Sequence, residues 1–257
     1  MTGKEQMVFN AISSYDLITV DEITDLMPGH NELTINKACS SLASKGYLYR
    51  LQKGAYIVQK KPSGAPVIKD PYRIALTLFK GYIGFSSALK IYGLIDYEPF
   101  TIFVVTSNKS REIPIGEYVF KAVAMGKRAV GITYYNGVYT STVAKTFFDC
   151  FYRPQYGGGY STITQALDGV EGMDWGEFLQ YFDLASDSLC QRTGYVLNMF
   201  DRETQKIPVH VIDYFRKRIK NNTRLLPSGG GEETYSREWM VLDNLGKENI
   251  MSWWHYG

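Results

Sequence analysis

Cysteine and histidine are scarce in this chain and widely scattered along it. The chain has three cysteines and three histidines, all far apart in sequence: Cys39, Cys150, Cys190, His30, His210 and His255. Disulfide frameworks and zinc sites need closely spaced residues of these types, so the pattern argues against both. We expect buried free thiols, no metal and no cofactor.

Long apolar runs and strong net charge are also missing. No stretch approaches the roughly 20 residues that span a bilayer, and the first residues lack the basic, apolar and small-residue order of a signal peptide. The formal net charge of +2 is too small for a protein that coats nucleic acid or membrane surfaces. We therefore expect a cytoplasmic protein with no membrane partner.

The length of the chain and a segment with prolines and a glycine at 62–66 indicate more than one domain. A chain of 257 residues is long for one core. Pro62, Ser63, Gly64 and Pro66 neither continue a strand nor start a long helix. We predict an α+β fold with a winged helix-turn-helix at 1–61, a linker at 62–69, and a larger mixed α/β domain at 70–257 that has a helical C-terminal part.

The stretch 21–58 carries the winged helix-turn-helix pattern. We expect Asp21 to cap a short helix at 22–27, and Asn31 to cap a second helix at 32–45 that Gly46 ends. The aromatic and β-branched runs that follow predict a hairpin wing at 47–51 and 55–58. An amphipathic helix at 4–14 and a short strand at 17–20 complete this module, and the strand is expected to pair with the wing.

The outer face of the second helix and the wing offer the side chains that DNA recognition needs. Small or hydrogen-bonding side chains can approach base edges, and basic residues on a wing meet phosphates. The predicted DNA-binding residues are Thr34, Asn36, Lys37, Ser40, Ser41, Lys45, Arg50, Gln52 and Lys53. Acids nearly cancel the basic charge of the first sixty positions, so a winged-helix module that binds only protein stays open as an alternative.

Further along, helices and strands alternate. Asp70 and Pro71 predict a helix start, and Asn136 with Gly137 predicts a type I′ hairpin. The segment 107–116 is polar and is expected to be a loop or a long hairpin connection. The expected helices and strands are helices at 72–79 and 86–92, strands at 99–106 and 117–124, and the hairpin strands 131–135 and 138–141.

The last part of the chain is predicted to be mainly helical. A helix at 143–152 carries Lys145 and Asp149 four residues apart, a pattern typical of an ion pair on a solvated helix face. An aromatic tail with Trp253 and Trp254 is expected to cover the second domain's sheet or to bind another chain. Between them we expect helices at 161–167, 175–184, 188–200 and 208–219, a glycine-rich turn at 229–231 and a strand at 238–244.

The order of these features resembles the AbiEi antitoxin family, over nearly the whole chain. The matching segments are Gly46-Tyr-Leu-Tyr-Arg50, Lys53-Gly-Ala-Tyr56, Tyr82-Ile-Gly-Phe-Ser-Ser-Ala-Leu-Lys-Ile-Tyr-Gly-Leu94, Phe103-Val-Val-Thr106, Val143-Ala-Lys-Thr-Phe-Phe-Asp-Cys150 followed by Arg153-Pro154, and Arg192-Thr-Gly-Tyr-Val-Leu197. Each segment alone is short, and their order and spacing carry the resemblance. The tail and the connection 223–234 do not match the pattern.

This resemblance implies an antitoxin of a type IV toxin-antitoxin, or abortive-infection, system. In that reading the N-terminal domain is a transcriptional autorepressor that binds inverted repeats in its own promoter. The larger domain counteracts a nucleotidyltransferase-like toxin without needing a stable complex with it, and the chain is not an enzyme. The residues of the antitoxin domain that match the family's motifs are Lys145, Thr146, Asp149, Arg153 and Arg192.

A metal-dependent nuclease fused to a helix-turn-helix is the enzymatic alternative. An α/β domain with Lys145 and Asp149 on one helix could house phosphodiester chemistry. Against it, the sequence has no convincing acidic strand motif with a neighbouring Glu-x-Lys, no paired histidines, and no nucleophile with an obvious base.

Overall fold

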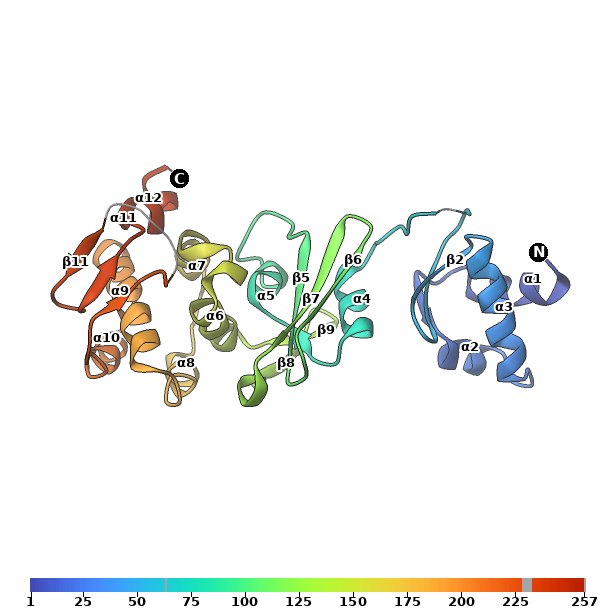
Figure 1. The fold of residues 1–257 in the computed structure, drawn as a ribbon, viewed down its shortest axis with the longest axis horizontal. Helices are drawn as coiled ribbons and strands as arrows, with labels where there is room; N and C mark the ends of the chain where they lie inside the picture. The colour runs from blue at the N-terminus through green and yellow to red at the C-terminus, as the bar shows by residue number, and fades with distance from the viewer. Residues whose placement is uncertain (63, 228–232, 257) are drawn as a thin grey trace. The chain divides into compact units, whose positions relative to one another are not determined.

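The computed structural model describes residues 1–62, 64–227 and 233–256, and it is a mixed α and β structure (Figure 1). The predicted α+β class is confirmed at this level. The chain forms two compact units: unit 1 is Met1–Gly81 with Phe100–Ala124, and unit 2 is Tyr82–Pro99 with Met125–Gly257. The boundary predicted at 62–69 falls within the sequence of unit 1 and stays a prediction, and residue 63 in it lies outside the described residues.

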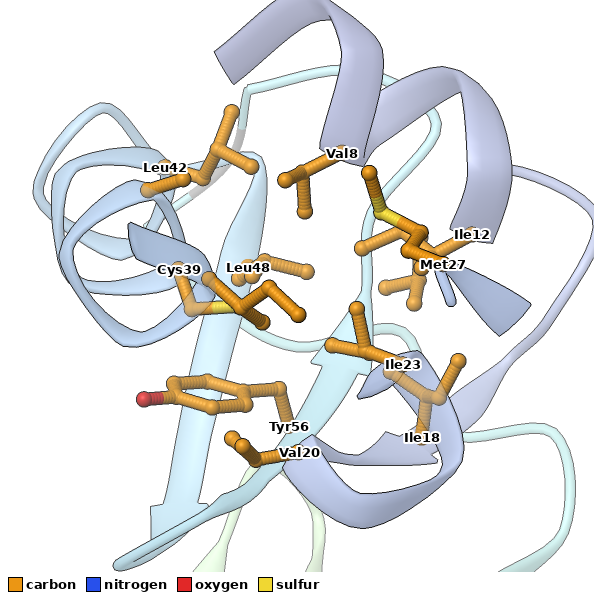
Figure 2. Close-up of a cluster of buried hydrophobic side chains, with 13 residues drawn as sticks. Val8, Ile12, Ile18, Val20, Ile23, Met27, Cys39, Leu42, Leu48 and Tyr56 are labelled. Atoms are coloured by element: carbon orange, nitrogen blue, oxygen red, sulfur yellow. The ribbon is translucent and has the colours of Figure 1, made fainter. Parts of the chain in front are cut away.

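The first part of unit 1 consists of three helices packed on a small antiparallel sheet. Val8, Ile12, Ile23 and Leu42 are each at most 1% exposed and belong to the single core that these elements share (Figure 2). The strand order is β1-β3-β2, so the first strand pairs with the hairpin as expected. The elements are α1 (Gly3–Ile12), β1 (Leu17–Thr19), α2 (Val20–Leu26), α3 (Glu32–Ser44), β2 (Leu48–Gln52) and β3 (Ala55–Val58).

The start of α2 differs from the prediction. Thr19 caps this helix in place of Asp21: the Thr19 hydroxyl accepts the Glu22 backbone N–H at 3.2 Å, and the Glu22 carboxylate accepts the Thr19 N–H at 2.7 Å. This reciprocal capping box satisfies two backbone donors, and Asp21 alone would satisfy one. Asn31 does cap α3, and Gly46 follows that helix with φ +76°.

The rest of unit 1 is a helix with three strands. In it β7 pairs in parallel with β5 and antiparallel with β6. The predicted loop at 107–116 contains β6, so that part of the prediction was wrong. This strand pairs on one side only within the unit, which explains both its polar, exposed residues and its tolerance of Pro114. The elements are α4 (Pro71–Leu78), β5 (Thr101–Thr106), β6 (Arg111–Ile115) and β7 (Tyr118–Ala124).

Unit 2 begins with a small sheet and the helix that follows it. Its strand order is β4-β9-β8, and Asn136 and Gly137 join β8 to β9 with φ +48° and +83°. Both values are positive, as a type I′ turn requires, so the predicted hairpin is confirmed. The elements are β4 (Tyr82–Ile83), α5 (Phe85–Ile91), the 3-10 turn η1 (Gly126–Arg128), β8 (Ile132–Tyr135), β9 (Val138–Ser141) and α6 (Val143–Tyr152).

The remainder of unit 2 is mainly helical, as predicted, with one more small sheet. Its strand order is β10-β12-β11. Gly194 in the middle helix allows a close approach, since a Cβ there would lie 2.3 Å from the Trp239 ring. The predicted turn at 229–231 lies outside the described residues. The elements are η2 (Pro154–Tyr156), α7 (Gly159–Asp168), α8 (Trp175–Gln180), α9 (Asp187–Thr204), α10 (Val209–Arg216), β10 (Thr223–Arg224), β11 (Thr234–Ser236), β12 (Val241–Asp243), α11 (Lys247–Ile250) and α12 (Ser252–Tyr256).

The aromatic tail packs on helices of its own unit. The Trp253 indole N–H donates to the Thr164 hydroxyl of α7 at 2.9 Å, and its ring lies 6.2 Å from that of Phe200 in α9. Neither a sheet nor another chain is needed to hold Trp253, while Trp254 is 42% exposed. Within the described ranges, no helix is long and apolar enough to cross a membrane, and the cysteines are buried and free, as predicted.

Candidate functional site

A groove of about 570 Å³ brings together several of the predicted DNA-binding residues. Asn36 and Ser40 reach it from α3, and Arg50, Gln52 and Lys53 reach it from the β2–β3 hairpin. All but Asn36 are exposed residues. Helix capping, the hairpin and the shared core thus place two separate sequence segments on one surface.

Acidic residues line the same groove and reduce its positive charge. Asp21 and Glu32 border it, and the Asn36 amide donates to Glu32 at 3.2 Å. Gln52 donates its amide to the backbone oxygen of Thr77 at 2.7 Å. The groove therefore combines cations with carboxylates, which disfavours indiscriminate attraction of phosphates.

Arg50 also borders a second hollow, of about 640 Å³, that Ser44 and Lys45 line. Arg50 is exposed, and it has no carboxylate partner among the described residues. Two other predicted residues, Thr34 and Lys37, lie on α3 but line neither hollow. Lys37 is exposed, whereas Thr34 is half-buried.

Ser41 and Lys45 bind another side chain of the protein, the carboxylate of Glu5. The Ser41 hydroxyl donates to Glu5 at 2.6 Å and the Lys45 ammonium donates at 2.7 Å, while the Thr2 backbone N–H adds a third bond at 2.6 Å. Lys45, then Ser41 and Thr2, lower the pKa of Glu5 to about 2. Glu5 is 5% exposed, so this cluster joins α1 to α3 at the edge of the core.

Glu5 is a residue that the sequence analysis missed. Its position three residues after Thr2 marks a capping box, which the structure contains. That signal places Glu5 at the start of α1. It does not reveal Ser41 or Lys45, because the contact depends on how α1 packs against α3.

Lys145 and Asp149 are fully buried, each 0% exposed, and they form a direct ion pair within α6. The expectation of a solvated helix face was therefore wrong. All residues of α6 from Ala144 to Phe151 are buried, because Tyr181 and the segment at Gly131 cover the side that carries the pair.

Burial dominates the electrostatics of this pair. It lowers the pKa of Lys145 and raises the pKa of Asp149 to about 6, and in each case the partner's charge opposes the shift. The ammonium also lies 5.2 Å from the ring centre of Phe148 and 5.6 Å from that of Tyr181. One carboxylate oxygen of Asp149 has no hydrogen-bond partner among the described residues.

Thr146 fixes the start of α6. Its hydroxyl donates to the Thr142 backbone oxygen at 2.8 Å and lies 2.6 Å from the Ser141 hydroxyl. Thr146 and Ser141 are both 0% exposed. The contacts tie α6 to the end of β9 and leave Thr146 inaccessible to a ligand.

Arg153 and Arg192 are brought together elsewhere in unit 2. Both line a cavity of about 620 Å³, Arg153 from the end of α6 and Arg192 from α9. The Nε atom of Arg153 is buried without a hydrogen-bond partner among the described residues. The motif residues therefore fall into two groups, a buried one in α6 and one that faces a cavity.

The described residues hold no group of three or more histidines, cysteines or acids able to bind a metal ion. The three cysteines are buried in separate places, and burial raises the pKa of each thiol. These thiols are therefore poorly placed to act as nucleophiles.

Comparison with known proteins gives a likeness of fold. No protein-family model matches the chain, and no curated protein matches it in sequence. Among solved structures, the crystal structure of the RV2827C protein from Mycobacterium tuberculosis aligns with a TM-score of 0.70 at 17% sequence identity. The alignment covers 99% of this chain and 95% of that one. At this identity the likeness concerns the fold.

Proposed function

We propose that this chain is a DNA-binding transcriptional regulator and the antitoxin of a type IV toxin-antitoxin system. In this proposal residues 1–58 act as a winged helix-turn-helix, with α3 as the recognition helix and the β2–β3 hairpin as the wing. The observation that carries it is the groove lined by Asn36, Ser40, Arg50, Gln52 and Lys53.

The chemistry of this groove suits a DNA duplex. Serine and asparagine side chains on an exposed helix face can hydrogen-bond to base edges in the major groove. Arg50 and Lys53, on the hairpin, supply charge for the phosphate backbone. Because Ser41 and Lys45 are held by Glu5, we assign the main DNA contacts to the groove residues and Lys37.

The modest charge predicts binding through a few placed contacts. Asp21 and Glu32 in the groove oppose non-specific attraction, so sequence-independent affinity is expected to be weak. A single small domain makes few base contacts. We therefore propose that two copies bind the inverted repeats of the chain's own promoter together.

The antitoxin activity is assigned to the remainder of the chain through its resemblance to the AbiEi family. We propose that it counteracts a nucleotidyltransferase-like toxin and has no catalytic activity of its own. The nuclease alternative relied on Lys145 and Asp149. Both side chains are fully buried and paired with each other, so neither can contact a substrate in this conformation.

Titration of labelled promoter DNA with the full chain tests the regulatory half of the proposal. We expect binding to the upstream region with inverted repeats and weaker binding to scrambled DNA. Arg50→Gln should weaken binding to every sequence, whereas Ser40→Ala should change which sequence is preferred. Lys4→Gln, an exposed charge on α1 outside the groove, is the matched control.

Unchanged DNA binding after Arg50→Gln and Lys53→Gln together would refute the interface. Complete absence of DNA binding would favour the alternative of a protein-interaction module. Co-expression with a nucleotidyltransferase-like toxin encoded beside this chain tests the antitoxin half, since growth should be restored. If growth is not restored by the folded chain, the antitoxin assignment is wrong.

A further inference from the structure

The cavity that contains Arg153 and Arg192 is a pocket of the size and character of a small-molecule site. Its volume of about 620 Å³ lies within the roughly 300–1,000 Å³ typical of such sites. The described residues that line it all belong to unit 2: Phe151, Tyr152, Arg153, Pro154, Gln155, Gly159, Tyr160, Arg192, Leu225, Leu226, Pro227 and Leu245. The cavity is therefore separate from the groove proposed to bind DNA.

The charge of this lining is unbalanced. Among the described residues it includes two arginines and no acidic residue. Neither Arg153 nor Arg192 has a carboxylate partner among the described residues, and the buried Nε of Arg153 lacks any hydrogen-bond acceptor there. Guanidinium groups in a partly desolvated pocket normally bind an anion, and they match the geometry of phosphate and carboxylate oxygens.

Other arginines of unit 2 do have carboxylate partners. On α9, Arg202 pairs with Glu238 at 2.8 Å; on α10, Arg216 pairs with the same carboxylate at 2.8 Å. Arg218, just after α10, pairs with Asp187 at 3.0 Å. Arg192 lies on the same helix as Arg202 and faces the cavity without such a partner. Unlike these three arginines, the two arginines of the cavity lack a carboxylate partner among the described residues.

Asp243, whose charge acts on the lining residue Tyr160, is not a carboxylate partner of either arginine. One of its oxygens accepts the Tyr195 hydroxyl at 2.8 Å, and the other accepts the backbone N–H groups of Leu245 and Gly246 at 2.9 Å. Burial raises the pKa of Tyr160 to about 12, and Arg192 opposes the shift while Asp243 adds to it. Tyr160 consequently stays a neutral hydroxyl in the lining of the same cavity.

The lining combines polar with apolar groups. Gly159 begins α7, a helix of ten residues without a side-chain N-cap, and this helix start, Gln155 and the arginines all favour an anion. The other described lining groups are leucines, prolines and aromatic rings. A ligand that satisfies both kinds of group has an anionic head and an apolar or aromatic body.

We propose that this cavity binds a small phosphate monoester with an aromatic body, which is the chemistry of a nucleoside monophosphate. Arg153 and Arg192 contact the phosphate, and the aromatic and leucine side chains contact the body. The inference does not depend on DNA binding or on the antitoxin role, because it rests on the side chains of this cavity alone.

Isothermal titration of the full chain with AMP, UMP, adenosine and inorganic phosphate tests the proposal. We expect saturable binding of at least one nucleotide, weaker binding of phosphate, and no binding of adenosine. Losing a charge-assisted contact in Arg192→Gln or Arg153→Gln should weaken binding about 10- to 100-fold. Arg192→Lys keeps the charge without the fork geometry, so its affinity should lie between that of the natural chain and that of Arg192→Gln.

Arg202→Gln is the matched control, because it removes an exposed arginine of the same helix and lies outside the cavity. Circular dichroism and the unfolding midpoint without ligand verify that the variants fold. Absence of binding of both nucleotides at millimolar concentration would overturn the proposal. Equal weakening by Arg202→Gln, or binding of a 5′-phosphorylated oligonucleotide without either mononucleotide, would also overturn it.

Discussion

Two lysine–carboxylate pairs in this molecule occupy opposite environments. Lys45 and Glu5 join α1 to α3, and the Lys45 side chain is 41% exposed. Lys145 and Asp149 lie one turn apart on α6, and both side chains are 0% exposed. The pair that is local in sequence is therefore the buried one, and the pair that is distant in sequence reaches solvent.

The difference teaches that the spacing of charges does not report their burial. An i, i+4 pair has the same sequence pattern on a wet helix face and inside a core. Its energetic role changes completely between the two, because solvent screens an exposed pair and desolvation penalises each member of a buried pair. Four experiments, in order of decreasing effect on stability, test this contrast.

Breaking the buried pair should have the largest effect. Lys145→Met or Asp149→Leu leaves one charge buried without its partner, and we expect each to lower the free energy of unfolding by about 3–5 kcal/mol. The double variant Lys145→Met with Asp149→Leu removes both charges and should recover most of that loss. Urea denaturation of the full chain measures both effects.

Asp213→Ala is the control for this experiment. Asp213 pairs with Arg216 at 3.5 Å on an exposed face of α10, and its loss should cost less than about 1 kcal/mol. If the single variants at Lys145 and Asp149 cost no more than this control, burial does not set the role of the pair.

Adding a side chain at Gly131, next to Lys145, should have the next largest effect on stability. A Cβ at Gly131 would lie 2.3 Å from the Tyr181 hydroxyl and 2.9 Å from the Lys145 side chain. Gly137 in the same hairpin also has a positive φ, with nothing within 4 Å of an added Cβ. Gly131→Ala should therefore destabilise by about 1–3 kcal/mol more than Gly137→Ala, as thermal unfolding can measure. Equal losses would show that backbone strain alone matters.

The half-exposed pair should respond to acid. The pKa of Glu5 is lowered from 4.5 to about 2, so the folded chain binds fewer protons at this site than the unfolded chain between those values. The stability that Glu5 contributes is present above pH 4.5 and is lost as the pH falls toward 2. The difference in unfolding midpoint between the natural chain and Glu5→Gln should shrink over that range. A difference that stays constant across the range contradicts this role.

Removing an exposed cation should affect stability least. Lys53 is exposed on the hairpin, so Lys53→Gln should change the free energy of unfolding by less than about 0.5 kcal/mol. If Lys53 contacts a phosphate, the same change should reduce the salt dependence of DNA binding by about one unit of slope. Lys45→Gln should show the reverse: lower stability and an unchanged slope. Identical behaviour of the two variants would remove the distinction between the internal and the external lysine.

Local signals were sufficient to predict most helices and strands. Asn31, Gly46 and the Asn136–Gly137 turn act through their own backbone neighbourhood, and the structure places them where the sequence predicted. The cap at Thr19 was also a local signal, since Thr19 and Glu22 have capping-box spacing. The prediction of Asp21 as the cap did not take this spacing into account.

The missed features depend on contacts between distant segments. Lys145 is buried because Tyr181 and Gly131 cover α6, and no local pattern in 143–152 contains that information. The cavity likewise depends on Arg153 and Arg192 lining one space although they lie far apart in sequence. More of the groove could be predicted from the sequence. Its residues on α3 and on the hairpin lie close in sequence, and the short connection between these elements limits how far apart they can lie.

The interleaved chain path has a consequence for modularity. Unit 1 consists of Met1–Gly81 with Phe100–Ala124, so the segment Tyr82–Pro99 of unit 2 lies between its two pieces. A single recombination breakpoint cannot exchange either unit intact, because every cut within 82–124 divides one of them. The two units are therefore expected to be inherited and to diverge together, whereas the segment 1–58 can be exchanged with one breakpoint.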